Sequence, residues 1–203
     1  MRHPAPSSPA RRREPAARRW LAWALWGCCF VAGLAPGLAQ NPVSKEYQIK
    51  AAYLYNFAKF VEWPDPAFTN NDSPLVIGVF GQNPFGGELT AIAKDHKVNG
   101  RNIVIKHVAT VTEARGVHLM FFGAAEAGHL AETLAALKAN SVLTVGESEK
   151  FITAGGMINF VLAENTVRFE INAAAAEQQG LKISAQLLKL AKAVRPKPRQ
   201  IPP

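Results

Sequence analysis

The residues whose types and spacing come closest to a binding site lie on a predicted strand, Thr166–Ile171. Strand alternation places Phe169 on one side of the sheet, and Arg168 and Glu170 on the other. A guanidinium beside amide and carboxylate groups, close to a glycine loop, could bind a carboxylate or amino-acid-like ligand. The alternative is a solvated hairpin face that carries an Arg–Glu pair. The candidate ligand-binding residues are Arg168, Glu170, Asn172, Gly155 and Gly156.

A second candidate surface is an aromatic stripe on the predicted first helix, which begins at the N-cap Ser44 and ends at Val61, just before Pro64. One apolar stripe, which includes Leu54, suffices to pack the helix on a sheet. The aromatic stripe is rotated from it by roughly 100° and needs another partner. That partner is either a second helix of the same chain, such as the C-terminal one, or another protein or a second copy. The candidate partner-binding residues are Tyr53, Phe57, Phe60 and Trp63.

Motifs for catalysis or metal binding are not matched. The loop Gly81–Glu88 has the glycine spacing of a phosphate loop but lacks its lysine. Histidines recur every eleven residues from His96 to His129, yet they fall on different predicted elements and share no face. Glu147 and Glu149 are expected to point to solvent from a short loop. The sequence therefore predicts no enzyme, no cofactor and no metal ion.

The first 39 residues have the pattern of a secretory signal peptide that is cleaved after Ala39. A basic segment precedes an uncharged apolar run, Trp20–Leu34, which is shorter than the ~20 residues of a spanning helix. A retained anchor, or a lipid on Cys28, is the alternative. This segment holds both cysteines, six of the 23 basic residues and one of the 15 acidic ones, so its removal lowers the net charge from +8 to +3. A nucleic-acid partner is therefore not predicted.

Apolar runs rich in β-branched residues alternate with helix-compatible segments, a pattern typical of a parallel sheet covered on both faces. The predicted strands are Leu75–Phe80, Ile103–Val108, Val117–Phe122 and Val142–Val145, and the clearest helix between them is Glu126–Ala139. Two further strands, Met157–Ala163 and Thr166–Ile171, are joined by the polar pair Glu164-Asn165 as a hairpin.

The chain after the hairpin is predicted to be helical. Asn172 can cap a short alanine-rich helix and Gly180 can close it. A terminal helix from about Ser184 is expected to bury Leu187, Leu188, Leu190, Ala191 and Val194. The fold class is therefore α/β: one three-layer domain over residues 43–194, with a mostly parallel sheet flanked by helices, a C-terminal antiparallel hairpin and a terminal helix. The basic, proline-rich segment 195–203 is predicted to be a disordered tail.

Several separated motifs in this order resemble one known family. They are Ala51–Pro64 (AAYLYNFAKFVEWP), Ile77–Gly86 (IGVFGQNPFG), Val142–Gly146 (VLTVG) and the segment 155–191. Together they make the chain similar to the YfiR-like family of exported proteins, formerly a domain of unknown function, from about Glu46 to Ala191.

The resemblance implies a function that the residues alone do not. The best-studied members of the YfiR-like family are periplasmic repressors of membrane-bound diguanylate cyclases. The resemblance thus implies that this chain is a periplasmic regulatory binding protein, whose partner is a membrane signalling protein with a periplasmic sensor domain. A homodimer is also compatible with the aromatic stripe. The alternative is a periplasmic receptor for a small carboxylate or amino-acid-like ligand.

Overall fold

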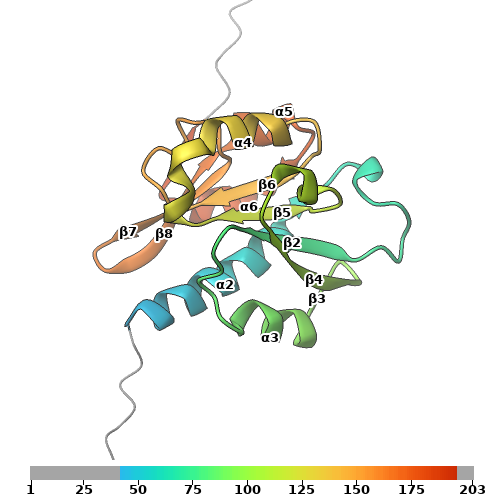
Figure 1. Ribbon diagram of the computed structural model, residues 1–203, viewed down its shortest axis with the longest axis horizontal. Helices are drawn as coiled ribbons and strands as arrows, with labels where there is room; N and C mark the ends of the chain where they lie inside the picture. The colour runs from blue at the N-terminus through green and yellow to red at the C-terminus, as the bar shows by residue number, and fades with distance from the viewer. Residues whose placement is uncertain (1–41, 196–203) are drawn as a thin grey trace, which may run out of the picture. The chain divides into compact units, whose positions relative to one another are not determined.

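The fold was analysed in a computed structural model, which describes residues 42–195 (Figure 1). The predicted signal peptide and the last eight residues of the predicted tail lie outside this range. Within it, no helix combines the length and the apolar character needed to cross a membrane.

An eight-stranded sheet forms the centre of the fold, with the strand order β10-β8-β7-β6-β5-β2-β4-β3. Neighbouring strands are parallel except in two pairs, β7 with β8 and β3 with β4. A separate two-stranded antiparallel sheet joins β1 to β9. The strands are β1 (Val61–Glu62), β2 (Leu75–Phe80), β3 (Lys97–Val98), β4 (Arg101–Val108), β5 (Leu119–Phe122), β6 (Leu143–Gly146), β7 (Ile158–Ala163), β8 (Thr166–Asn172), β9 (Lys182–Ile183) and β10 (Ala193–Arg195).

Helices cover both faces of the sheet, as the sequence predicted. The α-helices are α2 (Pro42–Phe60), α3 (Glu88–Asp95), α4 (Leu130–Leu137), α5 (Ala173–Gln178) and α6 (Ala185–Leu190). Side chains of α2, α3 and α6 join one buried cluster with Leu119 and Phe121, whereas α4 joins a second cluster with Met120 and Phe122. Strand β5 thus sends alternate side chains into two cores, which explains its uninterrupted apolar sequence. Figure 1 shows α2 and α3 on one side of the sheet and α4 on the other.

The predicted strands and the hairpin are confirmed, with small changes at their ends. β2 has the predicted bounds, and the turn residues Glu164 and Asn165 both have positive φ, at 51° and 58°. Two left-handed residues give the type I′ geometry that suits a two-residue hairpin. On β8, Val167, Phe169 and Ile171 are buried, so the predicted alternation is also confirmed.

The prediction of a terminal helix that reaches Val194 is wrong. The Ser184 hydroxyl accepts the predicted capping hydrogen bond, from the Leu187 amide, but α6 ends at Leu190. The chain then turns and forms β10 beside β8, and Leu190 and Val194 stay exposed. The edge of β8 has backbone N–H and C=O groups that need hydrogen-bond partners, and β10 supplies them. A longer α6 would leave these groups unpaired. The edge exists only once β7 and β8 have joined the sheet, so the local sequence does not reveal it. Arg195, placed in the predicted tail, belongs to this strand.

The strand order places a topological switch point beside α2. Counted along the chain from β2, and leaving out the short β3, the strands β4, β2, β5, β6 and β7 have the order 2-1-3-4-5. The chain therefore crosses in one direction from β2 to β4 and in the opposite direction from β4 to β5, which lies on the other side of β2. In open α/β sheets, ligands bind outside the carboxyl ends of the strands at such a point.

Candidate functional site

A pocket of about 440 Å³ lies at the carboxyl edge of the sheet, next to the switch point. We call it the carboxyl-edge pocket. One wall is the N-terminal half of α2, the floor is the loops that follow β5 and β6, and the other wall is β7 where it extends beyond its pairing with β6. Its lining residues are Glu46, Tyr47, Lys50, Ala124, Glu147, Glu149, Asn159, Phe160, Val161 and Leu162.

A nearly buried ion pair between Lys50 and Glu147 is the central feature of this pocket. The two side chains are only 5% and 7% exposed, and Lys50 Nζ lies 2.5 Å from Glu147 Oε2. Lys50 Nζ also lies 2.5 Å from Glu46 Oε1, one helical turn earlier on α2. All ion pairs found among residues 42–195 involve Lys50. The ammonium group is therefore held between two carboxylates, one from its own helix and one from the end of β6.

Two further donors satisfy the Glu147 carboxylate. The Tyr47 hydroxyl donates to Glu147 Oε1 over 2.9 Å, and the Ala124 backbone amide donates to the same oxygen over 3.0 Å. Burial, together with the negative charge of Glu147, raises the pKa of Tyr47 above its usual range. Tyr47 consequently remains a hydroxyl donor at physiological pH. The expectation that Glu147 points to solvent is wrong, because α2 places a lysine and a tyrosine directly above it.

Asn159 completes the pocket from β7. Its side chain is almost entirely buried, at 3% exposure, and Asn159 Oδ1 has no hydrogen-bond donor within residues 42–195. A buried polar atom without a partner costs about 1–3 kcal/mol, so native structures rarely keep one without a reason. Ser148 Oγ, in the loop that follows β6, is likewise buried and has no hydrogen-bond partner within residues 42–195.

The charged and amide groups of this pocket are suited to binding a polar ligand. The pocket-lining residues include no serine, cysteine or histidine that could act as a nucleophile or be activated as one. The described part of the chain also holds no group of three His, Cys, Asp or Glu side chains arranged to bind a metal ion. A rigid set of charged and amide groups can instead recognise and orient a polar ligand.

The structure separates the predicted ligand-binding residues. Gly155 and Asn172 line a different hollow, of about 510 Å³, whose cations are Lys138 and Arg195. Arg168, Glu170 and Gly156 do not line it. Asn172 Oδ1 accepts a hydrogen bond from the Ala175 amide and caps α5, as the sequence predicted.

Gly156 has a packing role in the structure. A Cβ atom at this position would overlap the ring of the buried Phe151, and so would one at Gly146. The two glycines therefore make room for one aromatic side chain. Arg168 is exposed on the outer side of the hairpin, and its predicted part in ligand binding stays a prediction.

The aromatic stripe on α2 has its partner inside the chain. Phe57 is fully buried and stacks on Phe160, at 5.6 Å between ring centroids, and Tyr53 contacts Phe160 and Phe169. The prediction that Phe57 belongs to an exposed surface is therefore wrong. The partner of Tyr53 and Phe57 is the β7–β8 hairpin, and α2 also contacts the C-terminal helix α6, as the sequence predicted. Tyr53 and Phe60 keep part of their surface exposed, and their contact with another protein stays a prediction.

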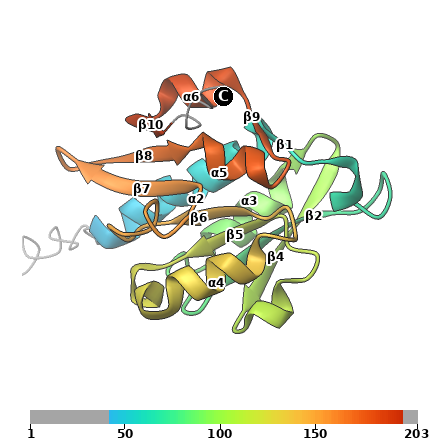
Figure 2. The same ribbon diagram turned by 90° about the horizontal axis from the view of Figure 1, so that it is seen from above.

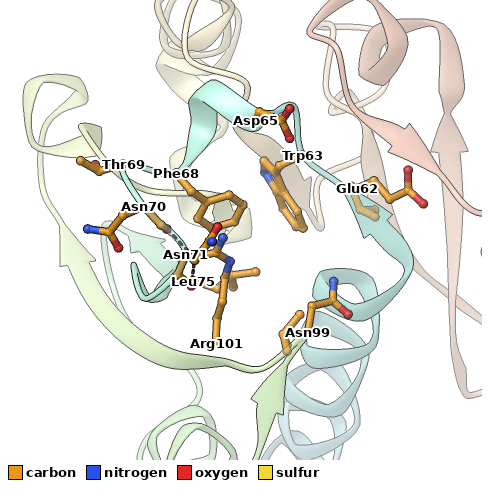
Figure 3. A pocket seen from close by; sticks show the side chains of 12 residues that line it. Glu62, Trp63, Asp65, Phe68, Thr69, Asn70, Asn71, Leu75, Asn99 and Arg101 are labelled. Atoms are coloured by element: carbon orange, nitrogen blue, oxygen red, sulfur yellow. Dashed lines mark hydrogen bonds between the residues drawn. The ribbon is translucent and has the colours of Figure 1, made fainter.

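Trp63, the fourth predicted partner-binding residue, lines a second pocket at the amino edge of the sheet, of about 520 Å³ (Figure 3). Its Nε1 atom donates to the backbone oxygen of His118, 3.1 Å away. Phe68 stacks on the His118 ring, and the guanidinium carbon of Arg101 lies 3.9 Å from the centroid of the Phe68 ring. Arg101 Nη1 donates to the backbone oxygens of Asn70, Asn71 and Ser73. This pocket thus consists largely of groups that brace the loop between β1 and β2.

The sequence analysis missed Tyr47, Lys50 and Glu147 as a site. Lys50 precedes Leu54 by four residues and Phe57 by seven, so it occupies the buried stripe of α2. A lysine at such a position needs a buried carboxylate, because an unpaired buried charge is costly. A lysine in an apolar stripe could therefore have been recognised from the sequence as a sign of a buried ion pair. The sequence alone does not indicate which acidic residue pairs with it.

Comparison with protein families gives one match. The model of the YfiR/HmsC-like family covers residues 47–192, which is more than half of the chain. The chain belongs to the YfiR/HmsC-like family. No curated protein sequence matches it. The YfiR/HmsC-like family consists of periplasmic regulators rather than catalysts, and the matched segment includes most of α2, the strands β1 to β9 and the carboxyl-edge pocket except Glu46.

Proposed function

We propose that this protein is a periplasmic regulatory binding protein that controls an inner-membrane signalling enzyme, a diguanylate cyclase, by contact with its periplasmic sensor domain. Its effect on cyclic-di-GMP would then pass through the membrane partner, without contact with the nucleotide. The observation that carries the proposal is the family match over residues 47–192. The pattern of a secretory signal in the first 39 residues supports export.

We assign the partner contact to the surface formed by the start of α2 and the tip of the β7–β8 hairpin. These segments lie at the same end of the molecule (Figures 1 and 2) and both line the carboxyl-edge pocket. Each exposes an apolar side chain: Ile49 is 40% exposed and Leu162 is 59% exposed. Tyr53 lies one helical turn after Ile49 and extends this surface. Exposed aliphatic and aromatic side chains beside charged ones are typical of a protein interface.

The chain offers a matched pair of residues for the test. Leu162 and Leu190 have the same exposure, 59%, but Leu190 lies on α6. A photo-crosslinking amino acid placed at each position in cells should distinguish the two surfaces. We expect position 162 to crosslink to a membrane protein that carries a periplasmic sensor and a cytoplasmic diguanylate cyclase domain, and position 190 to give no such product.

The regulatory output is tested in the same cells. Deletion of the gene should change the cyclic-di-GMP concentration, Leu162→Asp should reproduce that change, and Leu190→Asp should leave the wild-type level. Circular dichroism and periplasmic abundance control for folding and export. If deletion leaves cyclic-di-GMP unchanged and position 162 captures no cyclase, the proposed function is wrong. If deletion acts but position 190 crosslinks instead, the function stands and the assigned surface is wrong.

A further inference from the structure

The last part of the sequence carries a strong positive charge. Glu177 is the final acidic residue, and residues 178–203 contain six basic ones: Lys182, Lys189, Lys192, Arg195, Lys197 and Arg199. Residues 40–177 contain eleven basic and 14 acidic residues, so their net charge is −3. The positive charge that remains after loss of the predicted signal peptide therefore comes from the C-terminal part alone.

The basic side chains of this part have no acidic partner within the described range. Lys189, Lys192 and Arg195 are exposed, and all ion pairs among residues 42–195 involve Lys50 instead. Like charges gathered in one place repel one another and destabilise the compact state. An anionic partner would remove that repulsion, so the charge pattern favours one.

Two exposed apolar side chains lie among these charges. Leu190, the last residue of α6, is 59% exposed, and Val194 on β10 is 39% exposed. They are four residues apart, which limits the distance between their Cα atoms to about 14 Å. β10 directly follows α6 in the chain (Figure 2), and it is an outermost strand of the eight-stranded sheet. The apolar pair and the basic side chains therefore belong to one exposed edge of the molecule.

Exposed aliphatic side chains among lysines fit an anionic lipid surface better than a protein surface. On a bilayer, aliphatic groups enter the boundary between headgroups and acyl chains, while Lys and Arg contact the acidic headgroups. Protein interfaces are depleted in lysine, yet three of the five basic residues from 189 to 199 are lysines. The negative net charge of residues 40–177 disfavours approach of the other faces to such a surface, so this edge would face it.

We infer that this protein binds anionic phospholipid membranes through the edge formed by the end of α6 and β10. Lys189, Lys192 and Arg195 contact the acidic headgroups, and Leu190 and Val194 enter the boundary of the acyl chains. The inference uses the periplasmic location in the proposed function and adds a second surface to it.

The membrane contact is separate from the assigned partner contact. Leu190→Asp keeps every basic residue of the edge and leaves the Leu162 surface intact. The partner itself lies in the inner membrane, so binding at Leu162 still brings the variant there. We therefore expect Leu190→Asp to weaken vesicle binding and still to leave cyclic-di-GMP at the wild-type level.

Vesicle binding by the purified protein, residues 40–203, tests the inference. Vesicles of equal parts phosphatidylglycerol and phosphatidylcholine are compared with vesicles of phosphatidylcholine alone in a co-sedimentation assay. In about 50 mM salt we expect at least about thirtyfold tighter binding to the anionic vesicles. In about 500 mM salt most of that difference should disappear, because salt screens interactions between exposed charges.

Charge-matched variants locate the contact. Lys189→Gln/Lys192→Gln should weaken binding to the anionic vesicles by about 25-fold, since each basic residue near such a surface contributes about fivefold. Lys94→Gln/Lys97→Gln removes the same charge from exposed positions of α3 and β3 and should weaken binding by less than about threefold.

A pair of labelled positions shows which residues enter the bilayer. Both cysteines lie in the predicted signal peptide, so Leu190→Cys and Leu162→Cys each provide a single thiol for a polarity-sensitive dye. Leu190 and Leu162 are equally exposed, at 59%. On addition of anionic vesicles we expect a blue shift of the dye emission at position 190 and none at position 162.

Four results would overturn the inference: no preference for anionic vesicles, an equal loss in the control variant, no blue shift at position 190, or an equal shift at position 162. Binding to soluble polyglutamate but not to vesicles would also overturn it and would indicate an acidic protein as the partner. These experiments contain no cyclase, so their failure is distinguishable from failure of the proposed function.

Discussion

Removing both charges of the Lys50–Glu147 ion pair should destabilise the protein by less than the sum of the two single removals, because each single removal leaves the other charge buried without its partner. Both side chains are more than nine-tenths buried, so removing one leaves an uncompensated charge in a poorly solvated place. Such a removal typically costs about 3–5 kcal/mol. For Glu147→Gln we expect about 3 kcal/mol, the lower end of that range, because Lys50 keeps its contact with Glu46. For Lys50→Met we expect about 2–3 kcal/mol, since Glu147 keeps its hydrogen bonds from Tyr47 and Ala124.

The double variant Lys50→Met/Glu147→Gln is the decisive measurement. With neither charge present, the unpaired-charge penalty disappears, and the loss should be about 3 kcal/mol rather than the sum of the single losses. The coupling energy is therefore expected to be about 2–3 kcal/mol. Urea unfolding at pH 7, followed by circular dichroism, gives the free energy of unfolding for the four proteins of the cycle. Lys45→Met, at an exposed position of the same helix, is the control and should stay within about 0.5 kcal/mol of wild type.

Two results would refute this reasoning. Additive losses, with a coupling energy below about 0.5 kcal/mol, would show that Lys50 and Glu147 do not depend on each other in solution. A double variant more stable than wild type would show that desolvation of the two charges outweighs their attraction, as happens for some buried pairs. In that case the pair would be retained for the geometry of the pocket rather than for stability.

Two further predictions concern other parts of the fold. His118 Nδ1 accepts from the Val76 amide while Nε2 donates to the Ala67 oxygen, and burial lowers the pKa of His118. As pH falls, the unfolded chain takes up a proton on His118 before the folded chain does. The contribution of neutral His118 to the free energy of unfolding is therefore full above about pH 6.5 and is lost, by up to about 1.4 kcal/mol per pH unit, as pH falls towards the lowered pKa. Urea unfolding between pH 7.5 and 5.5 should show a flatter pH dependence of the free energy of unfolding for His118→Gln than for wild type. Gly156→Ala should lower the free energy of unfolding by about 2–4 kcal/mol, because the added Cβ would overlap the Phe151 ring. Gly128→Ala, where a Cβ meets open space, is the control and should be nearly neutral. Equal unfolding midpoints for the two variants would contradict this packing role of Gly156.

The sequence by itself determined the fold class and most of the strands. Strand β2 and the turn of the β7–β8 hairpin were predictable because they depend on local signals: a run of β-branched residues, and two residues that tolerate positive φ. The caps at Asn172 and Ser184 were predictable for the same reason, since a side-chain oxygen caps amides only three residues away. Family membership was also readable, because its motifs are contiguous segments in a fixed order.

Only the tertiary structure decided what each surface of α2 contacts. Two apolar stripes could be counted from the sequence, but which one needed a partner outside the chain depended on where β7 and β8 lie. The hairpin covers Phe57 and leaves Ile49 exposed, so the aromatic stripe is mostly core. The ion pair between Lys50 and Glu147 joins residues 97 positions apart, and no local pattern links them. The candidate site exists because parallel strands bring their carboxyl ends to one edge, where α2 supplies the opposite charge.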